Sequence, residues 1–487
     1  MGSLARTVVG EPDEWESGAG VTRIVIMGGG PAGYEAALVA AQHGSDVTVV
    51  ERAGMGGACV LDDCVPSKTF ISSAGVRVDV NRARDLGMRL AREDVGVDLP
   101  VVNARVKGLA LAQSADVRAR VEREGVRIVR GSACFSDEPA PRSPHVIEAT
   151  TADGGREILP ADVVLIATGA TPRVLDDAKP DGERILTWRQ LYDLDELPEH
   201  LVVVGSGVTG AEFVSAYVEM GARVTLVSSR DRVLPGEDAD AAAVLQDVFA
   251  ERGVEILSQA RAESVRREGD GVVVTLSDGR TVTGSHALMT VGSVPNTTDL
   301  GLEKIGIETD RGGFIPVDRV SRTSVPGVYA AGDCTGVLML ASVAAMQGRV
   351  AMWHALGEGV APIKLKTVAS AVFTRPEIAT VGISQRAIDA GEVPARTIMM
   401  PLSTNPRAKM QGLRRGFVKL FCRPATGVVV GGVVVAPVAS ELVLPIALAV
   451  QNGLTVDDLA YTFSVYPSLS GSITEAGRQL MRHGDLD

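Results

Sequence analysis

The chain has 487 residues, a net charge of −12 and 45% hydrophobic residues. A chain of this length forms more than one hydrophobic core, so we expect two to four domains that meet at clefts. The acidic balance disfavours nucleic acid as a partner. Five cysteines in so long a chain do not form the disulfide framework of a small secreted domain, which favours a reducing, cytoplasmic location.

Two segments bear on targeting and on membranes. Residues 1–20 are rich in acids and lack an apolar core, so they match neither a secretory signal nor a transit peptide. We predict a disordered extension there. The most apolar stretch, residues 427–450, is interrupted by Pro437 and Pro445, and it is predicted to form a buried strand followed by a helix rather than an integral membrane segment.

The first structured segment follows a strand, turn and helix pattern. A run of β-branched residues leads into a turn that contains Gly28, Gly30 and Gly33, and an Ala-rich helix comes next. Gly28 permits the tight turn, Gly30 lets the backbone approach a pyrophosphate, and Gly33 lets the helix pack on the strand. The following strand ends at Glu51, a carboxylate placed to accept a hydrogen bond from a ribose hydroxyl. This pattern predicts a dinucleotide site.

A second glycine turn of the same kind follows a later strand, so we expect two dinucleotide cofactors. Its glycines are Gly205, Gly207 and Gly210. At the end of the next strand the expected acid is missing, and Ser229, Arg230 and Arg232 occupy this region. Without a carboxylate the 2′-phosphate of NADP is not repelled, and either arginine could pair with it unless both are solvated surface charges. We predict tolerance of NADPH beside NADH rather than strict specificity.

Two cysteines, Cys59 and Cys64, lie close together in sequence after the first site. In a regular helix, residues five apart differ by about 140° around the axis, so the chain between the cysteines must distort before they can form a disulfide. A helix N-terminus stabilises a thiolate, which suits Cys64. The intervening Asp62 and Asp63 raise thiol pKa values and repel anionic disulfides, so we expect slow thiol exchange.

The order of these motifs, together with Ala167-Thr168-Gly169 and Ala331-Gly332-Asp333, resembles that of the pyridine nucleotide-disulfide oxidoreductases. Within that family the chain is most similar to dihydrolipoyl dehydrogenases, and more closely to actinobacterial flavoproteins of that type that reduce quinones. The resemblance implies an α/β fold with two Rossmann-like dinucleotide-binding domains, for FAD and for NADPH or NADH. A C-terminal α+β dimerisation domain, and hence a homodimer, is also implied.

The resemblance further implies domain bounds. The FAD-binding domain is expected to be discontinuous, over residues 21–174 and 286–358. The NAD(P)-binding domain would cover 175–285, and the dimerisation domain 359–487.

Residue roles follow from the same resemblance. Cys59 would be the interchange thiol and Cys64 the thiol beside the flavin. Lys68 would lie near the flavin N5 and pair with Glu212. Asp333 would bind the ribityl chain of FAD, although it could also cap a helix over residues 338–350. Further cofactor contacts are expected at Gly57, Thr168, Gly169 and Gly292. No His/Cys spacing typical of a metal site is present.

The chain departs from the family pattern near its C-terminus. The resemblance implies that disulfide reductases of the family carry a histidine where this chain has Tyr466, supplied to Cys59 by the other subunit, and a glutamate that orients it where this chain has Gly471. Histidine, with an ordinary pKa of about 6.5, transfers protons at neutral pH, whereas tyrosine, at about 10, does not. Losing such a general acid–base costs about 10²–10⁴-fold in rate.

We therefore favour transfer of a hydride from NAD(P)H to FAD and then to a quinone-type small-molecule acceptor. The main alternative is a dihydrolipoyl dehydrogenase or another disulfide reductase that uses a redox-active Cys59–Cys64 pair. A third hypothesis is a protein that binds both cofactors as a non-catalytic sensor.

Overall fold

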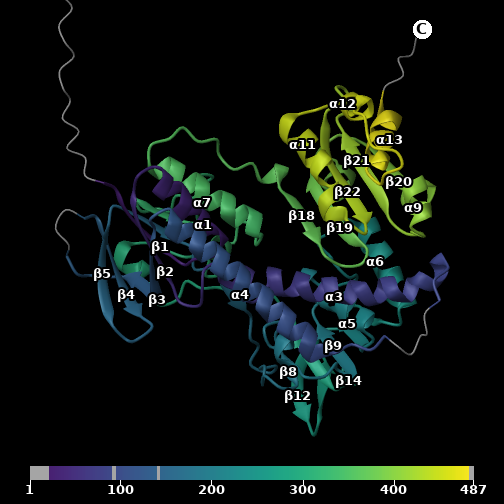
Figure 1. Cartoon of the computed structure of the whole chain (residues 1–487), viewed down its shortest axis with the longest axis horizontal. Helices are drawn as coiled ribbons and strands as arrows, with labels where there is room; N and C mark the ends of the chain where they lie inside the picture. The colour runs from purple at the N-terminus through teal and green to yellow at the C-terminus, as the bar shows by residue number, and fades with distance from the viewer. Residues whose placement is uncertain (1–20, 90–94, 140–142, 482–487) are drawn as a thin grey trace, which may run out of the picture.

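A computed structural model describes residues 21–89, 95–139 and 143–481. The predicted extension over residues 1–20 lies outside the described residues. The described residues form three larger β-sheets with helices packed against them and two smaller sheets, and the C-terminal part forms the yellow region of Figure 1. No helix of the described residues is long and apolar enough to cross a membrane.

The first sheet has seven strands in the order β17-β6-β1-β2-β3-β4-β5. Strand β1 is parallel to β2 and β6, and four of its five residues are buried, as expected for a central parallel strand covered on both faces. Helices α1 and α7 pack side by side against this sheet (Figure 1). The elements are β1 (Arg23–Met27), α1 (Pro31–Gln42), β2 (Asp46–Glu51), β3 (Arg127–Phe135), β4 (His145–Thr151), β5 (Arg156–Ala161), β6 (Val163–Ile166), β17 (Val328–Ala330) and α7 (Ala341–Ala355).

The second sheet is parallel, in the order β11-β10-β9-β15-β8, and an antiparallel sheet, β12-β13-β14, lies beside it. Strands β7 (Ala170–Pro172) and β16 (Ser293–Pro295) pair where the chain leaves the first region and returns to it. The other elements are β8 (Ile185–Leu186), β9 (His200–Val204), α5 (Val208–Met220), β10 (Arg223–Val227), α6 (Ala239–Glu251), β11 (Glu255–Leu257), β12 (Ala262–Glu268), β13 (Gly271–Leu276), β14 (Thr281–Gly284) and β15 (His286–Met289).

The third sheet is antiparallel, in the order β18-β19-β22-β21-β20, with helices on one face. The apolar stretch over residues 427–450 forms strand β22, as predicted, and then two short helices where one helix was predicted. The elements are β18 (Ala369–Val372), β19 (Glu377–Gly382), β20 (Arg396–Pro401), β21 (Phe417–Cys422), β22 (Val429–Ala436), α10 (Ala439–Leu442), α11 (Leu444–Asn452), α12 (Val456–Tyr461) and α13 (Gly471–Leu480).

Helix α3 (Cys64–Arg82) connects the three regions. It runs beside α4 (Leu99–Arg123), packs on α5, and passes below the third sheet (Figure 1). One hydrophobic core combines Phe70 of α3 with Tyr217 of α5 and Phe421 of β21. Side chains at the start of α3 are therefore within reach of both later regions.

One expectation about Asp333 is wrong. Helix α7 begins at Ala341 with Leu340 as its N-cap residue, so Asp333 does not cap it. Asp333 instead begins the short 3₁₀ helix η5 (Asp333–Thr335), because Gly332 before it has φ 81° and turns the chain.

Candidate functional site

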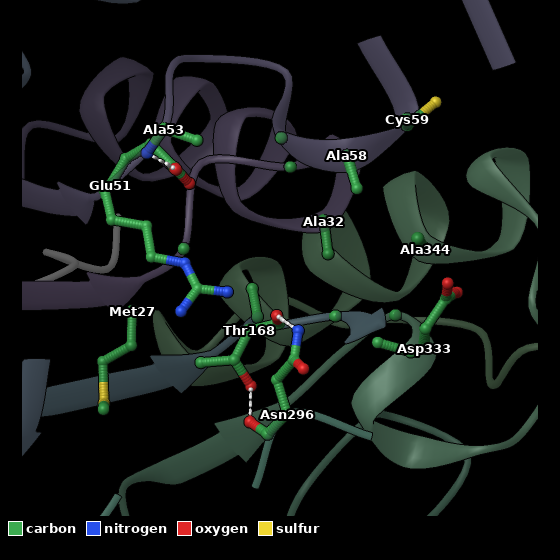
Figure 2. A pocket seen from close by; sticks show the side chains of 18 of the residues that line it. Met27, Ala32, Glu51, Ala53, Ala58, Cys59, Thr168, Asn296, Asp333 and Ala344 are labelled. Carbon is green, nitrogen blue, oxygen red and sulfur yellow. Dashed lines mark hydrogen bonds between the residues drawn. The ribbon is translucent and has the colours of Figure 1, made fainter. Parts of the chain in front are cut away.

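A cavity of about 640 Å³ opens at the carboxyl ends of strands β1, β2 and β6. Ligands of open α/β sheets bind at this edge. Figure 2 shows Glu51 on one side of the cavity and Cys59 and Asp333 on the other, with Thr168 and Asn296 between them. The volume lies within the 300–1,000 Å³ typical of small-molecule and cofactor sites.

The two glycine turns have nearly the same geometry. Gly28 has φ 111° and Gly205 has φ 114°, a backbone conformation that side chains rarely adopt. A Cβ on Gly33 would lie 1.9 Å from the oxygen of Gly28, and a Cβ on Gly210 would lie 2.0 Å from the oxygen of Gly205. Each helix therefore packs against its turn only because both positions are glycine.

The middle glycines, Gly30 and Gly207, face open space. A Cβ on either residue would meet no described protein atom within 4 Å. Each is the N-cap residue of the following helix, α1 or α5, where free N–H groups and the helix dipole favour an anion. The residues present thus fit a dinucleotide pyrophosphate at both turns.

Glu51 lies at the end of β2 and lines the cavity. One of its carboxylate oxygens accepts from the backbone N–H of Gly29 at 2.6 Å, and the other accepts from Ala53 at 2.7 Å and Gly54 at 3.3 Å. A carboxylate offers about four acceptor positions, so one remains for a hydroxyl of a bound ligand.

Thr168 and Gly169 lie where the chain leaves the first sheet. The Thr168 hydroxyl donates to the Asn296 carbonyl at 2.7 Å, and the Asn296 amide donates to the Thr168 carbonyl at 2.9 Å (Figure 2). Asn296 was not among the predicted site residues. Its position directly after strand β16 is the only local feature that could have indicated a role. Gly57, which lines the cavity, has φ 57°, and a Cβ there would lie 2.9 Å from the Cα of Gly30. Gly292 is exposed and does not line the cavity.

Cys59 and Cys64 belong to two different helices, α2 (Gly57–Leu61) and α3, because the chain leaves helical geometry at Asp62 and Asp63. This is the distortion that the helix periodicity requires. Both thiols are free. The interaction between the two neighbouring thiols raises the pKa of Cys59 and lowers the pKa of Cys64. Cys64, at the first position of α3, is therefore the better thiolate.

Lys68 and Glu212 form an ion pair between α3 and α5. The Lys68 Nζ lies 2.8 Å from Glu212 Oε2, and Glu212 is only 4% exposed in its side chain. Burial lowers the pKa of Lys68, but the charges of Glu212, Cys64 and Asp63 outweigh burial and raise it overall. Lys68 is therefore an ammonium at neutral pH. Neither residue of the pair lines the described cavity wall, which Cys64 and Asp63 form at this point.

Two acids face the thiols. Burial raises the pKa of Asp63, and burial together with the charge of Asp63 raises the pKa of Asp333 to about 6. Asp62 instead pairs with Arg189 of the second region, at 3.3 Å between Asp62 Oδ2 and Arg189 Nη2. The Arg189 Nε is buried with no hydrogen-bond partner among the described residues. Arg189 was not among the predicted site residues, because nothing local to residue 189 shows its distant partner.

The two arginines after the second glycine turn differ in their surroundings. Arg232 donates to the carbonyls of Pro235 and Glu237, so it holds its own loop together. Arg230 is exposed, and no described residue forms an ion pair with it. Ser228 beside it is fully buried and hydrogen-bonded to Ser206 of the glycine turn at 2.7 Å. Of the two arginines, Arg230 is the one whose guanidinium is free to contact a phosphate of a bound cofactor.

None of the described histidines lines the cavity. Each makes a hydrogen bond elsewhere: His43 to Val39, His145 to Pro326, His200 to Thr225, His286 to Ser285, and His354 to Tyr329. His483 lies outside the described residues. Tyr466 is 83% exposed, between α12 and α13. Within the described chain, the thiols therefore have acids and Lys68 around them but no imidazole. The described residues also contain no group of side chains suited to a metal ion.

Two dinucleotide turns that follow parallel strands of separate sheets, with a thiol pair at the first, define an oxidoreductase that uses two dinucleotide cofactors. The chain belongs to the pyridine nucleotide-disulphide oxidoreductase family, which it matches over residues 22–348, and it matches the dimerisation domain of that family over residues 368–477. Members use FAD and NAD(P)H, so the predictions of the family, the fold class, the enzyme class and the cofactors are confirmed.

Relatives cover nearly the whole chain. An NAD(P)H dehydrogenase (quinone) from Mycobacterium tuberculosis is 65% identical over 96% of this chain and 95% of its own length. Dihydrolipoyl dehydrogenase 2 from Haloarcula marismortui is 35% identical over 93% of this chain and 96% of its own length. The crystal structure of LpdA from Mycobacterium tuberculosis aligns with a TM-score of 0.91 and 65% identity, and covers 95% of this chain and 100% of that chain.

Proposed function

We propose that this chain is an FAD-dependent NAD(P)H:quinone oxidoreductase that acts as a cytoplasmic homodimer. The observation that carries the proposal is Tyr466, which is 83% exposed and occupies the position where disulfide reductases of the family carry the histidine that reaches the thiols of the other subunit. A disulfide substrate needs a proton donor at its thiol, whereas a quinone does not need thiol exchange at all. The 65% identical relative, named NAD(P)H dehydrogenase (quinone), supports the same acceptor.

Each residue near the thiols has a separate role in this proposal. Bound FAD supplies the two-electron chemistry between nicotinamide and acceptor. Lys68 places a fixed positive charge beside the flavin, and Glu212 orients that charge. Cys64, the lower-pKa thiol, lines the cavity and would be the thiol beside the bound flavin. Cys59 keeps its proton, because its interaction with the Cys64 thiol and its burial both raise its pKa.

The cofactor contacts follow from the cavity and the glycine turns. For FAD we assign the pyrophosphate to Gly28, Gly30 and Gly33, the adenosine ribose to Glu51, and the ribityl chain to Asp333. Further contacts come from Gly57, Thr168 and Gly169. For the nicotinamide dinucleotide we assign Gly205, Gly207, Gly210, Ser229, Arg230, Glu212 and Gly292, with Arg230 allowing NADPH.

We propose domain bounds that follow the sheets. The FAD domain comprises residues 21–174 and 290–358, and the dimerisation domain begins at residue 359. The nicotinamide domain comprises 175–289, four residues more than sequence analysis predicted, because strand β15 pairs with β9 in the second sheet.

A homodimer is supported by an exposed apolar segment after α12. Tyr461 is 76% exposed, Val465 78% and Phe463 102%. Large apolar side chains exposed together are typical of protein interfaces. They lie in the part of the chain that matches the dimerisation domain, so we propose that a second copy covers them.

The second candidate function is disulfide reduction. It is favoured by one observation, the proximity of the Cys59 and Cys64 thiols, each of which is the main influence on the pKa of the other, because neighbouring thiols can form a disulfide. A water molecule or a group outside the described residues would then have to transfer the proton.

The discriminating experiment compares acceptors in steady-state oxidation of NADPH. We expect fast turnover with menadione, and turnover with lipoamide or glutathione disulfide lower by about 10²-fold or more. Cys59→Ser should keep most of the menadione activity, since that activity does not use the interchange thiol. Equal turnover with lipoamide and menadione, or loss of menadione activity in Cys59→Ser, would refute the proposal.

An anaerobic reductive titration measures whether the thiol pair stores electrons. A working disulfide takes up two electrons beside the two of the flavin, so about four electrons per flavin indicate a redox-active pair. About two indicate the flavin alone. The same titration of Cys59→Ser provides the reference value for the flavin by itself.

A further inference from the structure

A single turn of the dimerisation domain reaches into the ion pair of Lys68 and Glu212. The turn joins β18 to β19 and begins with Phe373. Its backbone N–H at Phe373 donates to Glu212 Oε1 at 2.9 Å, while the other carboxylate oxygen of Glu212 binds Lys68. Both oxygens of a carboxylate that is 4% exposed are thus bound from opposite regions of the chain. This fixes the rotation of the Glu212 carboxylate.

The ring of the same residue contacts the cation of the pair. The Lys68 Nζ lies 5.0 Å from the centre of the Phe373 ring, within the range of a cation–π contact. The Lys68 side chain is 30% exposed, so part of it is open to other positions. Among the described residues, the Glu212 carboxylate and the Phe373 ring contact the ammonium and hold it in its position.

The turn is anchored by bonds that do not involve the ring. The Arg375 N–H donates to the Ser215 hydroxyl of α5 at 3.1 Å, and the Arg375 guanidinium donates to Asp79 of α3 at 2.8 Å. Together with the N–H of Phe373, these bonds tie the turn to both helices. A side-chain substitution at Phe373 therefore removes the contact with Lys68 and leaves the turn attached.

We propose that Phe373 is a positioning residue that holds Lys68 and Glu212 in the geometry in which the Lys68 charge acts on the flavin. This rests on the placement of Lys68 beside the flavin proposed above. A cation close to the flavin favours its reduced form, which carries the greater negative charge. Through Phe373 the dimerisation domain thus contributes to the reduction potential of the cofactor.

The test measures the midpoint potential of bound flavin in the holoenzyme, by equilibration with a reference dye under anaerobic conditions. Phe373→Leu keeps the backbone N–H and removes the ring. We expect a fall of about tenfold in the equilibrium constant for flavin reduction, which is about 30 mV to more negative potential for a two-electron couple. Stopped-flow reduction by NADPH should slow by about threefold to tenfold. Phe373→Tyr keeps a ring and should restore the wild-type potential.

A matched control exists in the same domain. Phe417 lies below another lysine, Lys419, at 5.6 Å from its Nζ, and is 4% exposed. Phe417→Leu should lower the denaturant midpoint and leave the flavin potential unchanged. A second variant, Phe373→Met, keeps apolar volume at the position and should give the same shift as leucine.

A double substitution shows whether the ring acts through the lysine. In a Lys68→Met background, Phe373→Leu should produce no further shift in potential. An equal shift in both backgrounds would overturn the proposal, as would an unchanged potential in Phe373→Leu and Phe373→Met. Loss of flavin from both variants would assign the ring to folding and would also overturn it. The potential is measured without an electron acceptor, so failure of quinone turnover would leave this result unaffected.

Discussion

Two lysines of this chain form buried ion pairs where regions meet, and they differ in how completely their charge is compensated. Lys419 of β21 is 2% exposed and donates three hydrogen bonds, two to Asp238 at 2.8 and 3.0 Å and one to Asp240 at 2.6 Å. An ammonium has three donors, so all are used. Lys68 is 30% exposed and has one carboxylate, Glu212, within 2.8 Å.

The residues around Lys419 compensate its charge more completely than the residues around Lys68 do. Asp238 is 3% exposed and also caps helix α6, so the Lys419 group is a closed connection between the third sheet and the second region. Lys68 adjoins the Cys64 thiol and the acids at the cavity wall, and its remaining donors are not taken by described carboxylates. A buried ion pair by itself does not mark a catalytic site; incomplete compensation beside a cavity does.

The largest effect on the free energy of unfolding is expected from removing Lys419 from its ion pair with Asp238. Lys419→Met leaves the buried charge of Asp238 without its partner, which costs about 3–5 kcal/mol in the free energy of unfolding. Urea denaturation followed by circular dichroism measures this loss. Asp240→Asn is the matched control, because Asp240 is 57% exposed and its loss should cost about 1 kcal/mol or less. Similar losses in both variants would contradict the distinction between a closed pair and a solvated one.

Substitution of the other lysine should affect chemistry more than stability. Lys68→Met removes the positioned charge, and we expect flavin reduction by NADPH to slow by about 10²–10³-fold. Stopped-flow absorbance of the bound flavin measures this rate. Lys419→Met, assayed below its unfolding transition, should reduce NADPH oxidation by less than about threefold. A wild-type rate of flavin reduction in Lys68→Met would refute the proposed role of Lys68.

Substitution of Asp333 tests whether the acids at the cavity lack a compensating positive charge. Its pKa is raised to about 6, mainly by burial, against about 3.9 in an unfolded chain. A carboxyl whose pKa is higher in the folded than in the unfolded state favours folding most below its unfolded pKa. The free energy of unfolding therefore falls as pH rises from about 4 to about 6. Two pKa units correspond to about 2–3 kcal/mol. Asp333→Asn should therefore stabilise the flavin-free protein by about that amount at pH 8 and by little at pH 4.

Urea titrations of wild-type and Asp333→Asn protein at the two pH values measure the difference. The loaded enzyme should respond in the opposite direction, because the same substitution removes a proposed contact with the ribityl chain and should weaken flavin binding. An equal stabilisation at pH 4 and pH 8 would show that the carboxyl is not responsible.

The smallest effect is expected at the rim of the cavity. The pair of Asp62 and Arg189 is about a third exposed on each side, at 38% and 36%. Such pairs contribute about 0.2–1 kcal/mol. A double-mutant cycle with Asp62→Asn and Arg189→Gln should give a coupling energy of unfolding in this range. A coupling energy above about 2 kcal/mol would contradict this expectation, because it would show that the Asp62–Arg189 pair behaves like the buried pair of Lys419 and Asp238.

Much of the fold followed from local patterns. The two glycine turns were predictable because a tight turn and a close helix need glycine at fixed spacing, as Gly28 and Gly33 show. The break between Cys59 and Cys64 was predictable from helix periodicity. The capping role considered for Asp333 was wrong, because the helix that follows begins later, at Ala341.

The sequence by itself determined the turns, the order of strands and helices, and the positions of the thiols, since each depends on residues that are close neighbours along the chain. Only the tertiary structure decided which distant side chains meet. The contact of Phe373 with Lys68 and the closed group of Lys419 arise from the way α3, α5 and the third sheet pack together. No local pattern records such packing, because it depends on the combined shape of surfaces from all three regions.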